Sequence, residues 1–213
     1  MTACVDTFAA GPLSCNCSIV ADPSSGEAAV IDPGGEVDRI IEVLGAHGLQ
    51  LKAIVHTHAH IDHILGTKRL AEETGAPVWL HAEDLPLYRG ISMQAAMLGM
   101  AGAPTPPEPD HFCVDGEELP LGPQEKLTVL HTPGHTPGSV CFHAASQSTL
   151  YSGDTLFRMG IGRTDLWGGS HPQIIQSIRE RLLTLPGDTE VVPGHGPATT
   201  IASELKSNPY LRS

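Results

Sequence analysis

A cluster of histidines and an aspartate, placed directly after an apolar segment, constrains this chain more than any other feature. Residues 53–55 have the apolar character of a buried strand, and residues 64–71 carry apolar side chains at helical spacing. The motif between them, H-x-H-x-D-H, consists of His58, His60, Asp62 and His63. The pattern predicts a strand, an exposed turn and a helix, with the polar cluster on the turn.

The residue types in this motif indicate metal binding. Imidazole and carboxylate groups suit zinc, iron or manganese, and alternate residues of an extended segment point to the same side. His58 and His60 therefore form one pair, while Asp62 and His63 can point at a second place. This arrangement suits two neighbouring metal ions. The alternative is a polar turn with exposed histidines and Asp62 as a helix cap.

Three later segments repeat the same logic. In each, a histidine or aspartate follows an apolar strand-like run and lies beside glycine: His135 within 131–139, Asp154 within 151–157, and His195 within 191–197. Glycine lets the backbone turn sharply and approach a crowded centre. We therefore expect these loops to converge at one edge of a sheet system.

Taken together, these motifs resemble the metallo-β-lactamase superfamily, and more narrowly its glyoxalase II (hydroxyacylglutathione hydrolase) branch in a short form. The resemblance runs from about residue 31 to residue 209. It implies an α+β fold, an αββα sandwich of two mixed β-sheets with helices on the outer faces. The metals would lie at the edge between the sheets.

The resemblance also implies roles for individual residues. His58, His60 and His135 would hold the first metal, Asp62, His63 and His195 the second, and Asp154 would bridge both. Two divalent ions, zinc foremost and iron or manganese otherwise, would activate a bridging hydroxide that attacks a thioester carbonyl. Asp62 would also act in catalysis by orienting that hydroxide.

The expected substrate is S-lactoylglutathione or a related hydroxyacylglutathione. Arg163 falls where the classical enzyme has a basic residue for glutathione, and Asp165 stands where a tyrosine is expected. The chain stops at Ser213, soon after a segment that resembles the family's N-P-[FY] motif. We therefore expect a site that lacks most of the helical C-terminal domain of the classical enzyme.

Other activities compete with this hypothesis. A persulfide dioxygenase would use one iron on His58, His135 and Asp154, and the run at 162–165 is shared with that branch. Against it, residues 193–197 read P-G-H-G-P where that branch has P-A-H-D-Y. Another metallohydrolase of the same fold, or a metal-binding module without turnover, stays open. A secreted β-lactamase fits poorly, because no signal sequence precedes the first strand and an aspartate stands at position 154.

Composition limits the partners. The 213 residues suit one domain, and 12 Lys and Arg face 24 Asp and Glu, a net charge of -12. Such a surface argues against nucleic acid and anionic membranes, and no apolar run is long enough to span one. Five irregularly spaced cysteines indicate reduced thiols. We expect a cytoplasmic monomer or small homo-oligomer that acts on a small molecule.

Local patterns predict the remaining elements. Helices are expected at 36–46, 62–74 and 172–185, the last capped by Ser170. Strands are expected at 5–8, 17–20, 27–32, 51–55, 77–80, 112–114, 127–130, 139–142, 149–151 and 189–192. Residues 82–110 are predicted to be a helical and loop insertion, whose stripe of Met93, Met97 and Met100 packs as core or lid. His56 and His131 are candidates for support behind the ligands.

Overall fold

The computed structural model describes residues 4–212, with side chains from residue 5, and contains two six-stranded sheets. The first sheet has the order β1-β2-β3-β4-β5-β6. Its strands are β1 (Cys4–Ala10), β2 (Cys15–Ala21), β3 (Glu27–Ile31), β4 (Gln50–Val55), β5 (Val78–His81) and β6 (His111–Cys113). Strands β1 to β3 pair antiparallel, and β3 to β6 pair parallel, so the sheet is mixed.

The second sheet has the order β14-β13-β10-β9-β8-β7 and is also mixed. Its strands are β7 (Glu118–Pro120), β8 (Lys126–His131), β9 (Val140–Ala144), β10 (Thr149–Gly153), β13 (Glu190–Pro193) and β14 (Thr199–Thr200). Only β10 and β13 pair parallel. A short hairpin of β11 (Leu156–Phe157) and β12 (Gly160–Ile161) stands apart from both sheets.

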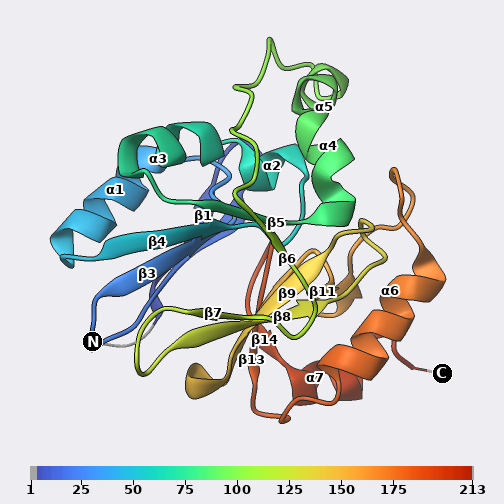
Figure 1. Cartoon of the computed structure of the whole chain (residues 1–213). Helices are drawn as coiled ribbons and strands as arrows, with labels where there is room; N and C mark the ends of the chain where they lie inside the picture. The colour runs from blue at the N-terminus through green and yellow to red at the C-terminus, as the bar shows by residue number, and fades with distance from the viewer. Residues whose placement is uncertain (1–3, 213) are drawn as a thin grey trace.

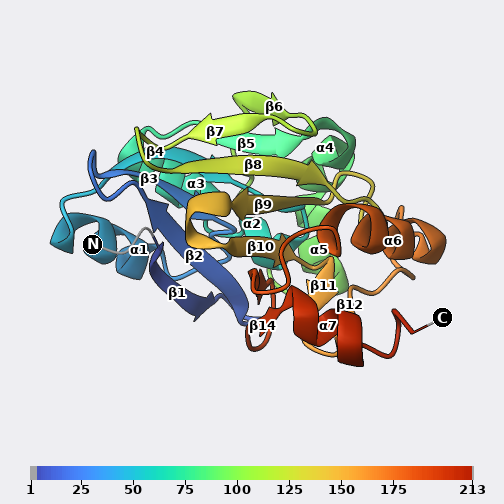
Figure 2. The same ribbon diagram turned by 90° about the horizontal axis from the view of Figure 1, so that it is seen from below.

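Helices cover the outer faces of both sheets (Figures 1 and 2). Helices α1 (Val37–Ala46) and α3 (Thr67–Thr74) pack on the first sheet through Ile40, Leu44 and Leu70. Helices α6 (His171–Ser177) and α7 (Ile201–Ser207) pack on the second through Ile174 and Ile201. A third apolar layer, between the sheets, joins strands such as β4 and β9. The predicted αββα sandwich of two mixed sheets is confirmed.

Strand direction brings the motif loops to one edge. Strands β3, β4 and β5 run parallel, so the residues that follow Ile31, Val55 and His81 emerge on the same side. In the second sheet β8 and β10 are both antiparallel to β9, and β13 is parallel to β10. The segments after β8, β10 and β13, which carry His135, Asp154 and His195, therefore also leave on one side.

The helix predicted at 62–74 is wrong as a single element. The chain forms α2 (Ile61–Ile64) and then α3, with a break at Gly66. The Gly66 amide donates to the Pro33 carbonyl at 2.8 Å, and a Cβ at residue 66 would lie 2.6 Å from that oxygen. This close approach of a distant loop interrupts the helix, although the apolar periodicity continues through it.

The helix predicted at 172–185 is shorter and changes its winding. Helix α6 is followed by a π-helical segment, η3 (Ile178–Leu182). Ser170 occupies the N-terminal cap position, but its side chain makes no capping hydrogen bond. The chain also forms four strands, β7, β11, β12 and β14, and helix α7, for which the sequence patterns gave no prediction.

Residues 82–110 form η1 (Ala82–Asp84), α4 (Leu85–Arg89), α5 (Ile91–Met97) and an extended return to β6. Tyr88, Ile91 and Ala95 join the core of the first sheet, and Met100 packs against it. The expected methionine packing is wrong for Met93 and Met97, which are 71% and 82% exposed. That this segment is an insertion stays a prediction.

Two expectations concern the chain as a whole. Cys15, Cys17, Cys113 and Cys141 are buried free thiols, while the side chain of Cys4 lies outside the described residues. Within residues 4–212, no helix combines the length and the apolar character that crossing a membrane requires.

Candidate metal centre

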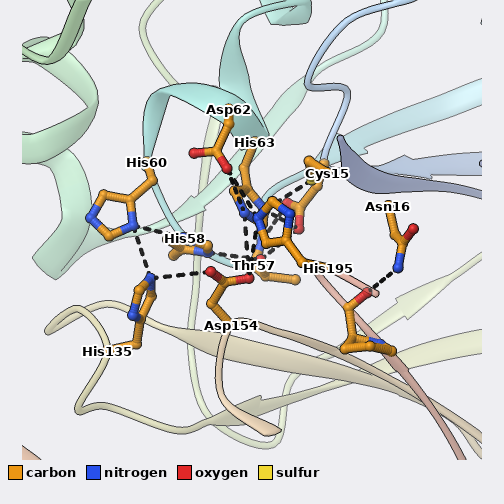
Figure 3. Close-up of polar contacts among 12 residues, drawn as sticks. Cys15, Asn16, Thr57, His58, His60, Asp62, His63, His135, Asp154 and His195 are labelled. Carbon is orange, nitrogen blue, oxygen red and sulfur yellow. Dashed lines mark hydrogen bonds and ion pairs between the residues drawn. The ribbon is translucent and has the colours of Figure 1, made fainter. Parts of the chain in front are cut away.

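Seven predicted ligands come together between the two sheets (Figure 3). The turn after β4 supplies His58, His60, Asp62 and His63, and the second sheet supplies His135, Asp154 and His195. We call these seven residues the centre. They divide into two groups of three that meet at Asp154.

The first group is made of three imidazoles. The Nδ1 atom of His60 lies 3.0 Å from Nε2 of His58 and 2.9 Å from Nε2 of His135. The three rings meet edge to face, with centroids 4.6 to 4.8 Å apart. Three ring nitrogens therefore converge on one small volume.

The second group combines two imidazoles and a carboxylate. The Oδ2 atom of Asp62 lies 3.1 Å from Nε2 of His195 and 3.6 Å from Nε2 of His63. Figure 3 shows Asp62 and His63 reaching this point from α2, and His195 from the opposite sheet. The expected split of the H-x-H-x-D-H motif into two pairs is seen directly.

Asp154 is shared between the groups. Its Oδ2 atom lies 3.6 Å from Nε2 of His135, whereas its Oδ1 atom lies 3.5 Å from Nε2 of His63 and 3.8 Å from Nε2 of His195. One carboxylate oxygen thus faces each group. This is the position expected of a residue that bridges two cations.

Hydrogen bonds on the far side of the rings fix which nitrogen carries a proton. The Thr57 hydroxyl donates to Oδ2 of Asp32 at 2.6 Å, so it can only accept from Nδ1 of His58, 3.1 Å away. Nδ1 of His63 donates to the same Asp32 carboxylate at 3.0 Å, and Nδ1 of His135 donates to the Arg163 carbonyl at 2.8 Å. Nε2 of His58 and of His135 therefore present lone pairs to the centre, as metal ligands must.

Asp84 ties together two loops of the first group. This buried carboxylate accepts from the Ala59 amide at 2.8 Å, between His58 and His60. It also accepts from the Thr136 hydroxyl at 2.9 Å and the Gly138 amide at 2.7 Å, both beside His135. Burial raises the pKa of Asp84, and the three donors oppose that rise. One side chain thus sets the spacing between ligands from different sheets.

The loop of His195 is held by a residue from the first sheet. The Asn16 side chain donates to the carbonyls of Pro193 and Gly196, both at 2.9 Å. Gly194 lies between them, and a Cβ there would collide with Oδ1 of Asp154 and the ring of His63. Glycine is required at this position because the backbone passes directly against two of the ligands.

The centre fits a pair of cations by its own chemistry. Nε2 of His63 and Oδ1 of Asp154 are buried and have no hydrogen-bond partner among the described residues. Buried polar atoms without partners are costly, and these two face the same point. In the first group the lone pairs on Nε2 of His58 and of His135 both face Nδ1 of His60, which can donate at most one hydrogen to them. Divalent metal ions would satisfy both sets of atoms.

The pKa values of the histidines agree with this division. Burial, together with the charge of His135, lowers the pKa of His60 to about 3. Burial alone would lower the pKa of His63, but Cys15, Asp32 and Asp154 raise it well above its usual value. The hydrogen bond to Asp62 raises the pKa of His195. The second group therefore attracts positive charge, which a bound metal ion would supply.

Arg163, the predicted substrate residue, lies at the mouth of the centre but is paired. Its Nε and Nη2 atoms donate to the two oxygens of Asp165, both at 2.8 Å, and both side chains are mostly exposed. The main chain of Arg163 contacts the centre directly, because its carbonyl oxygen accepts a hydrogen bond from Nδ1 of His135. Substrate binding by its side chain stays a prediction.

The two histidines suggested as supports differ in position. His56 is buried, with Nε2 3.1 Å from the Thr67 hydroxyl and Nδ1 3.9 Å from Asp32. His131 donates to the carbonyl of Pro137, in the His135 loop, and stacks on His81. Both therefore touch groups that hold the ligands, and neither belongs to the seven.

Sequence reasoning missed the supporting residues Asn16, Asp32, Thr57 and Asp84. For Asp32 a signal exists: it directly follows the apolar strand β3 and precedes Pro33-Gly34-Gly35, the same arrangement that marked the ligands. For Asn16 and Asp84 no local signal exists. Asn16 lies 177 residues from its partner Pro193, and Asp84 lies 25 residues from its partner Ala59, so the distance in sequence hides these contacts.

Comparisons with known proteins agree with this geometry. The sequence profile of the metallo-beta-lactamase superfamily matches residues 10–195. Hydroxyacylglutathione hydrolase GloC of Haemophilus influenzae is 38% identical over 199 residues, 93% of each chain. The crystal structure of BLEG-1 B3 metallo-beta-lactamase superposes with a TM-score of 0.89 at 35% identity, covering 98% of this chain and 99% of that one. TTHA1623, in a di-iron-bound form, gives a TM-score of 0.88 at 40% identity, covering 97% of this chain and 100% of that one. This chain belongs to the metallo-β-lactamase superfamily.

Proposed function

We propose that this protein is a dinuclear metal-dependent hydrolase that cleaves a thioester, with S-lactoylglutathione or a related hydroxyacylglutathione as reference substrate. The observation that carries the proposal is Asp154, whose two carboxylate oxygens face two separate groups of ligands. His58, His60 and His135 would hold one ion, and Asp62, His63 and His195 the other. The similarity to GloC supports the choice of a thioester.

The chemistry divides between the ions and the protein. When bound, two divalent ions lower the pKa of a water molecule to about 7 and polarise a carbonyl oxygen. Asp62 keeps an ionised carboxylate there: burial would raise its pKa, but the bond from His195 and the charge of His63 lower it. Asp62 can therefore orient the attacking water and accept a hydrogen bond from it. A thiolate leaves without help from a protein acid.

The remaining residues keep the ligands in position. The tautomers of His58, His63 and His135 are set by their Nδ1 partners, so none has to change protonation when substrate binds. Zinc, iron and manganese all accept this donor set, and the di-iron form of TTHA1623 supports including iron in the tests.

The proposal is tested by measuring metal content and S-lactoylglutathione hydrolysis in one preparation of the full chain. About two metal ions per chain together with turnover is the expected result. Loss of both after chelation, with recovery when zinc, iron or manganese is restored, would tie the activity to the centre. Two bound ions with no cleavage of any thioester would refute the proposed reaction.

Two other activities are distinguished by the same preparation. A persulfide dioxygenase would hold one iron with His58, His135 and Asp154. One iron per chain, with oxygen uptake on glutathione persulfide, would favour that activity. Because the chain is similar to BLEG-1 B3 metallo-beta-lactamase, β-lactam hydrolysis is the second activity to test, with a chromogenic cephalosporin as substrate. Either result without thioester cleavage would replace the proposed substrate.

A further inference from the structure

A cavity of about 340 Å³ opens directly onto the centre. Its floor is formed by His60, Asp62, His135 and Asp154, so a molecule in it lies against both groups of ligands. This volume falls at the lower end of the range found for small-molecule sites. The walls of this cavity therefore decide which part of a substrate lies beside the reacting atoms.

The walls are apolar. The side chains above the floor include Leu13, Met97, Leu98, Leu166 and Trp167, which we call the rim. All five are exposed, with Met97 at 82% and Trp167 at 56%. They come from the β1–β2 turn, from the end of α5, and from the loop before α6. Large apolar side chains gathered around an opening, rather than scattered singly, mark a surface that is covered when a ligand binds.

The rim is held in register with the centre. The Gln94 side chain accepts from the Ile61 amide at 2.9 Å and donates to the Ala59 carbonyl at 3.0 Å. It also donates to the Leu87 carbonyl of α4 at 2.9 Å. Met97 and Leu98 follow Gln94 by one helical turn. Figure 1 shows α5 and the loop before α6 rising on the same side of the sandwich. The position of α5 relative to the ligands is therefore fixed by hydrogen bonds.

Basic side chains are scarce in this cavity, although Asp62 and Asp154 form part of its floor. Among the described residues that line it, Arg163 is the only lysine or arginine, and Asp165 occupies its Nε and Nη2 donors. A glutathione arm carries two carboxylates, which would find few basic side chains on these walls. An apolar arm would instead bury the exposed rim.

We propose that the substrate is a thioester whose acyl group is an apolar chain of medium length, bound against the rim. This inference rests on the proposed thioester hydrolysis. The reaction adds one water: the carbon–sulfur bond breaks, a carbon–oxygen bond forms, and a carboxylic acid and a thiol are released. No oxidant or reductant is needed. Met97, Leu98 and Trp167 then select the acyl chain, while the centre performs the cleavage.

The experiment compares acetyl, butanoyl, hexanoyl and octanoyl thioesters of the neutral thiol N-acetylcysteamine on the metal-loaded protein. Each methylene buried against the rim raises kcat/KM by up to about fourfold. We expect a rise of about tenfold or more from acetyl to hexanoyl, and hexanoyl should exceed S-lactoylglutathione. The variant Met97→Ser/Leu98→Ser should flatten this rise. Leu205→Ser, on the exposed face of α7, is the matched control and should keep the full rise.

A binding measurement separates this inference from the proposed function. Non-cleavable thioethers of the same thiol, with ethyl to octyl chains, are titrated while Trp167 fluorescence is followed, and Trp167→Phe identifies the signal. Affinity that grows with chain length, without cleavage of any thioester, would refute the hydrolase but support the apolar site. Cleavage with equal rates for acetyl and octanoyl, and equal thioether affinities, would overturn the apolar site alone.

Discussion

The centre and the rim are neighbours, yet they are built in opposite ways. In the centre, His58, His63 and His135 each have a bonded Nδ1 atom and little or no exposure to solvent. In the rim, Met97 and Trp167 are mostly exposed. Burial and directional bonds permit one arrangement of donors, which determines the kind of reaction. Exposed apolar contacts leave room for different molecules, which determines the choice of substrate.

The strongest test of this difference removes the residue shared by both groups. Asp154→Asn keeps the shape of the side chain but loses its charge and one acceptor oxygen. We expect metal content to fall from about two ions per chain to one or fewer, and kcat/KM to fall by more than about a thousandfold, because the pKa of water returns toward 15.7. Metal analysis and steady-state kinetics check this.

Asp165→Asn, in the exposed loop beyond Asp154, is the control for that change. It should keep both metal ions and most of the activity, since Asp165 contacts Arg163 and none of the seven ligands. Equal losses in the two variants would show that the loop, rather than the shared carboxylate, controls metal binding.

A second test distinguishes the two halves of the centre through their supports. Asp84→Asn loosens the loops of His58, His60 and His135, and Asn16→Ala releases the loop of His195, which belongs to the second group. Each change should weaken one metal site by about 10- to 100-fold, the usual cost of losing such a partner. Competition with a chromogenic chelator measures the two affinities. Equal weakening of both sites in each variant would contradict separate supports.

The burial of His56, which contacts groups that hold the ligands, should make the stability of the protein fall in acid. Burial lowers the pKa of His56 to about 4, from about 6.5 in an unfolded chain. As the pH falls, the unfolded chain therefore binds this proton before the folded protein does. The contribution of neutral His56 to the free energy of unfolding is fully present above pH 6.5 and is lost as the pH falls toward 4. At pH 5 the loss is about 2 kcal/mol. Urea unfolding of the metal-free protein at pH 7 and pH 5 should show this loss, and His56→Asn should remove it from the total.

An exposed histidine provides the comparison for that experiment. His47→Asn, just beyond α1, should leave the difference between pH 7 and pH 5 as in the unchanged protein. If His56→Asn also leaves it unchanged, the fall in stability arises at other groups, such as the ligands themselves.

The smallest effect is expected at Arg163. Its side chain belongs to an exposed ion pair, and such pairs contribute about 0 to 1 kcal/mol. Its carbonyl, which holds His135, is unaffected by Arg163→Ala. Metal content should stay the same, and kcat/KM should change less than about fivefold. A loss of about a hundredfold on S-lactoylglutathione alone would instead show that the guanidinium binds glutathione.

Much of this architecture is readable in the chain itself. Apolar runs mark ten of the strands, and four motifs in a fixed order indicate the sandwich and its seven candidate ligands. The ligands are recognisable because each one follows a strand and lies near glycine. The break at Gly66 is not recognisable, because the apolar periodicity of residues 61–74 continues across it. Only the approach of Pro33 reveals it.

The sequence by itself determined the chemical groups and the order in which strands deliver them. Only the tertiary structure decided which ring nitrogen carries a proton, that Asp84 joins two loops, and that Met97 points outward rather than into the core. The physical reason is range. Strand patterns and turn residues act over a few positions, whereas burial and hydrogen-bond pairing depend on neighbours that the chain brings together from far away.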